Sequence, residues 1–288
     1  MRFEKWQALG NDYMIVEQED LPFALTPARV RRLCEGHFGV HADGVLEISR
    51  PQDPAHVADL RIFNPDGSEA ELSGNGAREA ILYLRHRGWT AEDTFAIHTA
   101  AGTIRPTITG PSTCRVDMGQ AQLHSKDFPG GPEDGRGQVS AGGAQWSFRH
   151  VSIGNPQCAI HVGSELELAA LTLESIGPEI EADDQFPNRT NVSWYTELAP
   201  GRVRARIFER GVGETLSSGT GAAGAAVAYR QERAGTSPGE AVSVILDGGE
   251  LEVEVGGDLR VHLSGWAVPV FEGRLSAAFL DELRQTAR

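Results

Sequence analysis

The chain has very few lysines. Of its 26 basic residues only Lys5 and Lys126 are lysines, and the other 24 are arginines. A pyridoxal phosphate enzyme needs a lysine to form its Schiff base, which arginine cannot do. Lys5 falls in an expected first strand and Lys126 in a polar loop. The scarcity therefore disfavours pyridoxal-dependent amino-acid chemistry.

Cysteines and long apolar runs are also scarce. Cys34, Cys114 and Cys158 are an odd, scattered set without CxxC spacing. Such a set predicts neither a disulfide framework nor a zinc site. It favours a reducing cytoplasm. No apolar run approaches the roughly 18 residues of a membrane span, and the N-terminus lacks the apolar stretch of an export signal.

Excess basic charge is missing as well. The net charge of −14 argues against a nucleic-acid partner, because phosphate contacts need a basic face. A length of 288 residues with 40% hydrophobic residues indicates a globular protein of two ordinary domains.

The sequence contains a repeated Ser-Gly-x-Gly-Ala motif. One segment closes on Ser73-Gly-Asn-Gly-Ala and another, half a chain later, on Ser218-Gly-Thr-Gly-Ala, each before a run that reads as helix. Glycines allow close approach of backbone amides, and a helix N-terminus stabilises a carboxylate and the extra charge it gains when the adjacent carbon loses a proton. Two matching groups on opposite faces of a carbon are what a stereochemical inversion needs. The plainer interpretation is a serine N-cap followed by a glycine turn.

The order of elements repeats with these motifs. Helices are expected from Thr26-Pro27 to about 35, over 76–87, 166–171, 173–181, 221–233 and 275–286, and a long loop over 125–145. Strands are expected at 2–7, 12–18, 45–48, 58–64, 94–99, 102–107, 114–118, 148–153, 158–162, 189–195, 202–208, 241–246, 249–255 and 259–265. The pattern predicts two α+β domains of similar build related by a pseudo-twofold.

Other catalytic patterns fit poorly. Residues 219–224 match the Gly-x-Gly-x-x-Gly dinucleotide fingerprint, but about ten loop residues separate them from the preceding strand. The Gly-x-Ser-x-Gly elbow of hydrolases fails because Glu71 and Leu216 occupy the required glycine positions. His37 and His41 are interpreted as ordinary surface or core residues.

Charged and amide side chains accompany the serines. Glu209 and Arg210 could meet the amino and carboxylate groups of an amino acid. Asparagines at expected strand–loop junctions form a further group, although asparagine is common in turns: Asn11, Asn64, Asn75, Asn155 and Asn191.

Together these segments resemble diaminopimelate epimerase, a pyridoxal-independent amino-acid epimerase of lysine and cell-wall synthesis. The resemblance runs from residue 1 to about 272. It is carried by Leu9-Gly-Asn-Asp12, Ala42-Asp-Gly44, Phe63-Asn-Pro-Asp-Gly-Ser-Glu69, Gly74-Asn-Gly-Ala-Arg78, Gly154-Asn-Pro156, Phe186-Pro-Asn-Arg-Thr-Asn191, Glu209-Arg-Gly-Val-Gly-Glu-Thr215 and Gly219-Thr-Gly221.

The resemblance implies a fold and a site. Each domain would be a mostly antiparallel sheet wrapped around a central helix, with residues 1–118 plus 267–288 in one domain, 119–266 in the other and the active site in the cleft between them. A homodimer without cofactor or metal is implied. The implied substrate-binding residues are Asn11, Asn64, Gly74, Asn75, Asn155, Asn191, Glu209, Arg210, Gly219 and Thr220.

The chain departs from the family at the reacting groups. Two cysteines flank the substrate carbon in that family, and their positions are Ser73 and Ser218 here; the histidine that helps set the acid/base state corresponds to Gln157. A helix N-terminus can draw a thiol to its thiolate, whereas a serine alkoxide is far harder to form. Either the pair was replaced deliberately, or this is a natural variant with weak or changed chemistry.

The leading hypothesis is a diaminopimelate epimerase-type isomerase, impaired by its two serines. One alternative keeps the fold with other chemistry, a lyase or another isomerase or racemase, in which Glu209, Glu214 or Asp66 acts as a single base. The other is a silent protein that binds an amino acid without turnover.

Overall fold

The computed structural model describes residues 1–233 and 239–286 and divides into two compact units. The first comprises Met1–Val116 with Gly265–Arg288, and the second Asp117–Ser264. The chain passes between them within β9 (Thr113–Gln120) and within β18 (Arg260–Trp266). These boundaries lie two residues before those expected from the sequence.

The first unit is built on one mixed sheet, in the order β19-β1-β2-β3-β4-β6-β7, with β5 attached to β4. Its strands are β1 (Arg2–Ala8), β2 (Asn11–Glu17), β3 (Val45–Ser49), β4 (Ala58–Phe63), β5 (Glu69–Ala70), β6 (Ile97–Thr99), β7 (Gly102–Ile104) and β19 (Val268–Arg274). Its helices are the 3₁₀ turn η1 (Gln18–Asp20), α1 (Pro27–Cys34), α2 (Gly74–His86) and α6 (Ala277–Gln285).

Helix α2 lies against β1, β2, β3 and β19. It buries every residue from Asn75 to Leu84, including Ile81 and Leu84 of the expected apolar face. A second cluster in this unit packs Met14 and Val45 of the sheet against Val30 and Leu33 of α1 and Leu283 of α6. The sheet is thus covered by helices drawn from both ends of the chain.

The second unit contains most of an eleven-stranded sheet, in the order β10-β11-β12-β13-β14-β16-β17-β18-β9-β8, with β15 attached to β14. Besides β9 and β18, its strands are β8 (Thr107–Gly110, from the first unit), β10 (Arg136–Ala141), β11 (Ala144–Ser152), β12 (Pro156–His161), β13 (Asn191–Ala199), β14 (Arg202–Glu209), β15 (Gly213–Thr215), β16 (Ala241–Leu246) and β17 (Gly249–Val255). Its helices are α3 (Glu165–Ala170), α4 (Leu173–Glu181) and α5 (Gly219–Glu232).

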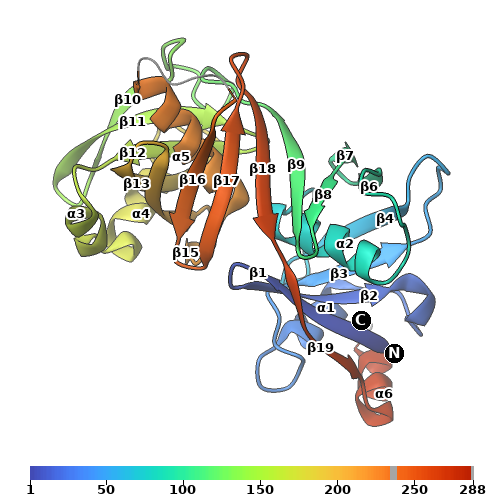
Figure 1. Cartoon of the computed structure of the whole chain (residues 1–288). Coiled ribbons are helices and arrows are strands. Elements are labelled where there is room, and N and C mark those ends of the chain that lie inside the picture. Colours follow the sequence, from blue (N-terminus) through green and yellow to red (C-terminus); the bar gives the residue numbers. More distant parts are fainter. Residues whose placement is uncertain (234–238, 287–288) are drawn as a thin grey trace. The chain divides into compact units, whose positions relative to one another are not determined.

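Helix α5 is the centre of this unit. It contacts β11, β12, β13, β14, β16 and β17, which curl around it (Figure 1). Its sequence, rich in alanine and glycine, is buried on all sides from Gly221 to Tyr229, as expected of a helix without a polar face. Small residues there let the strands approach closely.

The expected α+β class and the helices at both serine motifs are confirmed. One local prediction was wrong: the segment 125–145 is not a continuous loop, because β10 pairs antiparallel with β11 across Gly142-Gly143. The short strands β5 and β15 and the edge strand β19 were not expected from the sequence.

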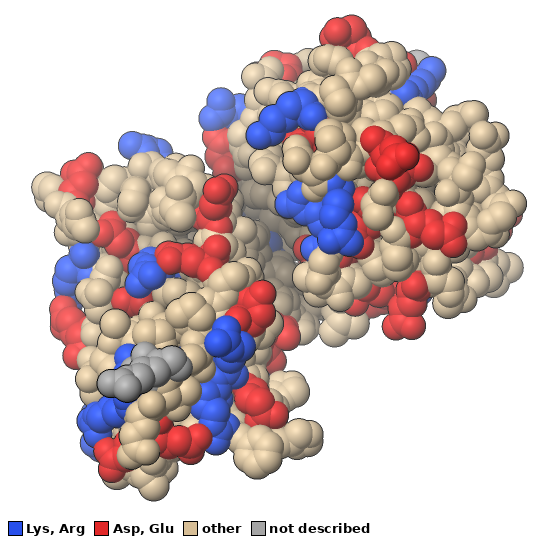
Figure 2. All heavy atoms as spheres, turned by 180° about the vertical axis from the view of Figure 1, so that it is seen from behind, with Lys and Arg blue, Asp and Glu red and all other residues tan. Residues whose placement is uncertain are grey.

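Acidic and basic side chains lie intermingled on the face shown in Figure 2 rather than in one basic patch. Within residues 1–233 and 239–286, no helix is both long and apolar enough to cross a bilayer.

Candidate functional site

Both serines of the repeated motif are helix N-caps. Ser73 Oγ accepts a hydrogen bond from the Gly76 amide at 3.1 Å, and Ser218 Oγ accepts one from the Gly221 amide at 3.2 Å. The plain interpretation of the motif is therefore correct for the free protein. It does not exclude a role toward a ligand, because each helix N-terminus keeps its partial positive charge.

In the first unit, strand order brings the expected residues to one sheet edge. β2 begins at Asn11 and runs parallel to β3, while β4 runs antiparallel to β3 and ends just before Asn64. The Tyr13 hydroxyl, on the same strand as Asn11, donates to Ser73 Oγ at 3.2 Å and ties the start of α2 to this edge.

The second unit repeats this arrangement. β12 begins just after Asn155 and runs parallel to β13, which begins at Asn191, while the antiparallel β14 ends at Glu209. Asn155 Nδ2 donates to Thr220 Oγ1 at 3.2 Å, which ties the start of α5 to the edge. Each unit thus carries one half-site of asparagines, a capping serine and a helix start.

In the first half-site both edge asparagines have protein partners. Asn11 Nδ2 donates to Asp43 Oδ2 at 2.9 Å, and Asn64 Nδ2 donates to Ser68 Oγ at 2.9 Å. Both side chains are partly exposed, so they retain a face toward solvent.

Gly74 and Asn75 form the first turn of α2 in this half-site. The buried Arg78 donates to Asn75 Oδ1 at 2.6 Å and to the Gly74 carbonyl at 3.1 Å. Sequence reasoning gave Arg78 and Tyr13 no role in the site. Arginine in a helix ordinarily signals an exposed position.

In the second half-site Gln157, which stands at the family's histidine position, belongs to a chain of hydrogen bonds. Gln157 is fully buried and donates through Nε2 to Asn155 Oδ1 at 2.6 Å, and Asn155 donates in turn to Thr220. Gln157 Oε1 has no hydrogen-bond partner among the described residues. Gln157 therefore orients Asn155, and as an amide it does not titrate near neutral pH and cannot act as an acid or base as a histidine would.

The Asn191 side chain forms hydrogen bonds with two backbone groups. Its Nδ2 donates to the Pro156 carbonyl at 2.9 Å, and its Oδ1 accepts from the Arg210 amide at 2.9 Å. The Arg210 guanidinium donates to the Asn188 carbonyl at 2.7 Å and is exposed. Asn191 thereby fixes the loop that presents Glu209 and Arg210.

Glu209 is the carboxylate that contacts a capping serine. Thr215 Oγ1 donates to Glu209 Oε1 at 2.8 Å, and the Ser218 hydroxyl is also hydrogen-bonded to this carboxylate. Burial raises the pKa of Glu209, and the hydrogen bonds from Thr215 and Ser218 oppose that rise. A carboxylate with a raised pKa beside a hydroxyl is suited to accept a proton.

The half-sites rest on matching hairpins, and the sequence carried a signal for them. Arg-Ile-Phe occurs at 61–63, where β4 ends, and at 206–208, just before Glu209 ends β14. Asn64 and Glu209 each stand nine residues before their serine. Each arginine pairs with the glutamate eight residues later on the short return strand, at 2.8 Å for Arg61–Glu69 and 2.7 Å for Arg206–Glu214. The repeat is therefore longer than the two Ser-Gly-x-Gly endings.

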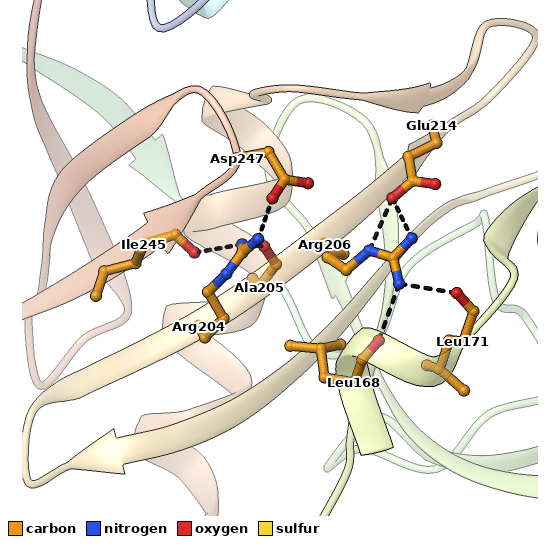
Figure 3. A network of polar contacts seen from close by, with 8 residues as sticks. All are labelled: Leu168, Leu171, Arg204, Ala205, Arg206, Glu214, Ile245 and Asp247. Carbon is orange, nitrogen blue, oxygen red and sulfur yellow. Dashed lines mark hydrogen bonds and ion pairs between the residues drawn. The ribbon is translucent and has the colours of Figure 1, made fainter. Parts of the chain in front are cut away.

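Figure 3 shows the second of these hairpin anchors. Arg206 holds Glu214 and also donates to the carbonyls of Leu168 and Leu171 at 2.9 and 2.8 Å. Arg204 beside it donates to the Ile245 carbonyl at 3.0 Å and pairs with Asp247. The Glu214 carboxylate thus stabilises the hairpin through its ion pair with Arg206.

Asp66, a possible base in one alternative, and the three cysteines lie in ordinary settings. Asp66 is exposed and accepts from the Ser68 hydroxyl and amide, which lower the pKa of its carboxyl. The thiols of Cys34, Cys114 and Cys158 are buried and unpaired, and burial raises the pKa of Cys34 and Cys114 to about 12. These thiols stay protonated at neutral pH.

Comparison with known proteins agrees with this geometry. The family model for diaminopimelate epimerase matches residues 3–124 and 149–265. A diaminopimelate epimerase of Synechococcus sp. (strain JA-3-3Ab) is 39% identical over 282 residues, covering 95% of this chain and 97% of the relative. One of Desulforudis audaxviator is 40% identical over 288 residues, covering 95% of this chain and 99% of the relative.

Solved structures share the fold at low identity. A PhzF-family phenazine biosynthesis protein of Bacillus anthracis superposes with a TM-score of 0.71 at 18% identity, covering 96% of this chain and 99% of that chain. A probable proline racemase of Agrobacterium radiobacter superposes with a TM-score of 0.71 at 15% identity, covering 96% and 93%. The match to the family model includes both serine motifs, and the chain belongs to the diaminopimelate epimerase family.

Proposed function

We propose that this protein is a diaminopimelate epimerase-type isomerase, which interconverts LL- and meso-diaminopimelate by proton transfer at Cα in lysine and cell-wall biosynthesis. The observation that carries the proposal is the pair of matched half-sites, each with a capping serine at the start of a buried helix. In the proposed reaction Ser73 and Ser218 act on opposite faces of one carbon.

The helix starts would stabilise the charge that develops. Loss of the Cα proton places extra negative charge on the α-carboxylate, and the amides of Gly74, Asn75, Gly219 and Thr220 would donate to it. Glu209 would hold the substrate ammonium group. No cofactor is needed for this scheme, because the developing carbanion is delocalised into the carboxylate.

The two serines would make this chain a weak catalyst. A serine hydroxyl is a much weaker acid than a thiol of pKa about 8.5, so neither face offers a ready base. The three cysteines that are present have buried, protonated thiols and do not replace the missing pair.

Two measurements test the proposed function. Calorimetry should show tighter binding of LL- or meso-diaminopimelate than of alanine, proline or glutamate, since a long ligand with polar groups at both ends uses more of the asparagines. Deuterium uptake at Cα should accompany binding, slowly. Tighter binding of proline would move the protein toward the proline racemases, and binding without exchange would support a silent amino-acid binder.

A second candidate rests on the hydrogen bond between Glu209 and the Ser218 hydroxyl. In this scheme Ser218 Oγ takes the Cα proton while its own proton passes to Glu209, so that one face alone is competent. The chain would then exchange the Cα proton with retention of configuration, or eliminate a leaving group where the substrate carries one. Exchange without inversion would identify this altered chemistry.

We also propose a cytoplasmic homodimer. Three free, buried thiols suit a reducing compartment. Strand β19 is the end strand of the first unit's sheet and exposes Val270 and Phe271 at 53% and 46%. An edge strand with exposed apolar side chains is a ready pairing surface. Phe271→Glu should shift the mass in light scattering from dimer to monomer, and an unchanged mass would place the interface elsewhere.

A further inference from the structure

Arg78 is a fully buried arginine beside the first half-site. Its exposed fraction is 0%, and its side chain runs back along α2 to the turn that Ser73 caps. There it donates to Asn75 Oδ1 at 2.6 Å and to the Gly74 carbonyl at 3.1 Å. These are the two residues of this unit that the proposed function assigns to the substrate carboxylate.

The charge of Arg78 has no ion-pair partner among residues 1–233 and 239–286, and its Nε has no hydrogen-bond partner there. The adjacent Glu79 does not neutralise it, because burial raises the pKa of Glu79 well above its usual range and favours the neutral acid. The Cys114 thiol near the guanidinium is also protonated. A buried, uncompensated cation is costly to a fold.

The other half-site has no such cation. Counting from the serines, Ala223 and Gly224 of α5 stand where α2 has Arg78 and Glu79. Helix α5 therefore keeps the same cap, turn and burial without a charged residue at this point. The arginine is not required by the helix architecture that the two units share.

We propose that Arg78 is a positioning residue of the first half-site: it fixes the Gly74-Asn75 turn for an α-carboxylate and adds a positive field behind it. The inference rests on the proposed function for the identity of the ligand. The expected ligand class is an α-amino acid whose carboxylate gains charge as Cα is deprotonated.

Hydrogen exchange on the free protein tests the positioning without any ligand. The Gly76 amide bonds to Ser73 Oγ and the Ala77 amide to the Ser73 carbonyl, so both report on this turn. In Arg78→Met their exchange should accelerate by about 10-fold or more, since two hydrogen bonds to a charged group are lost. Arg78→Lys should lie between the parent and Arg78→Met.

Two controls separate positioning from general loosening. The corresponding amides of α5, Gly221 and Ala222, should keep their protection in every variant. Glu79→Gln changes a neighbouring buried residue without removing a hydrogen bond and should leave Gly76 unchanged. Unchanged exchange at Gly76 and Ala77 in Arg78→Met, or equal acceleration in both helices, would overturn the proposal.

Binding tests the positive field. The diamide of diaminopimelate replaces each negatively charged carboxylate by a neutral amide of similar size and shape. Arg78→Met should weaken binding of diaminopimelate by about 10- to 100-fold and leave the affinity of the diamide nearly unchanged. Equal weakening of both ligands would contradict a role toward the carboxylate. If the parent chain binds no diaminopimelate, the proposed function fails, and the exchange experiment alone decides the role of Arg78.

Discussion

The two hairpin–helix segments, residues 61–79 and 206–224, share a scaffold and differ in charge. Both have an arginine–glutamate pair across the hairpin, a serine cap and a buried helix start. Where the first has Asn64 the second has Glu209, and where the first has Arg78 and Glu79 the second has Ala223 and Gly224. The parts that set geometry are kept, and the parts that set electrostatics have diverged.

Exchanging a helix residue between the halves should have the largest effect. Gly224→Glu gives α5 the residue of α2, but a Cβ at Gly224 would lie 2.9 Å from Gln157 Cβ. Overpacking and a buried carboxyl group should together cost about 3–5 kcal/mol in the free energy of unfolding. Gly224→Ala, with the overpacking alone and a gain in helix propensity, should cost about 1–2 kcal/mol. Urea unfolding measures both, and equal losses would show that charge burial adds nothing.

Replacing Glu209 by asparagine, the residue at the matching position of the first hairpin, should affect Cα proton exchange more than stability. Glu209→Asn gives the second half the amide of the first and removes the carboxylate beside Ser218. Cα deuterium uptake should fall by about 100-fold or more, within the range of a general base. Asn64→Asp is the matched change in the first half and should not raise exchange to compensate. Uptake that survives Glu209→Asn would remove Glu209 from the proton path.

The hairpin arginines should differ in their contribution to stability. Arg206→Met removes the hydrogen bonds that the guanidinium donates to Glu214 and to the carbonyls of Leu168 and Leu171, and its cost should be about 2–3 kcal/mol. Arg61 has a side chain that is 47% exposed and pairs with the exposed Glu69 and with the buried Glu47. Because solvent can partly replace the lost donor, Arg61→Met should cost less, about 1–2 kcal/mol. Denaturant midpoints of the two variants measure these losses of unfolding free energy. Equal losses would contradict the predicted difference.

Glu79 should make stability depend on pH. The raised pKa of Glu79 means that the folded state holds its proton after the unfolded chain has released it, so this contribution to stability is full below about pH 4.5 and is lost as pH rises toward the folded pKa. Over that window the loss should approach about 1.4 kcal/mol per pH unit. Glu79→Gln should flatten this slope in part, because the pKa values of Glu47 and Glu209 are raised as well. A slope that stays the same in Glu79→Gln would mean that Glu79 is ionised in the folded protein.

The sequence predicted the α+β class, most strands and the serine-capped helices, because caps, glycine turns and branched residues act locally. It failed for β10, where only Val139 and Ala141 are buried and the surrounding glycine and proline suggested a loop. It also missed β5 and β15, which are too short to show a period and are identified by their arginine–glutamate pairs.

The expected site residues do cluster within their own units, as strand order dictates once the sheets are known. Tyr13, Arg78 and Glu79 were missed because a phenol on a buried strand and charges in a helix carry no local mark of function. Their burial depends on tertiary packing that no window of sequence contains. The roles of the expected site residues toward substrate stay predictions.

The central claim is that Ser73 and Ser218 stand on opposite faces of one substrate carbon, at the positions where the family has its two thiols. The most direct test is epimerisation of LL-diaminopimelate, followed by deuterium incorporation and chiral analysis, in Ser73→Cys/Ser218→Cys and in each single variant. The double variant should gain several orders of magnitude over the parent, since each acid–base group contributes about 10²–10⁴-fold, while each single variant gains little inversion. A double variant that binds diaminopimelate well and still does not invert it would contradict the account.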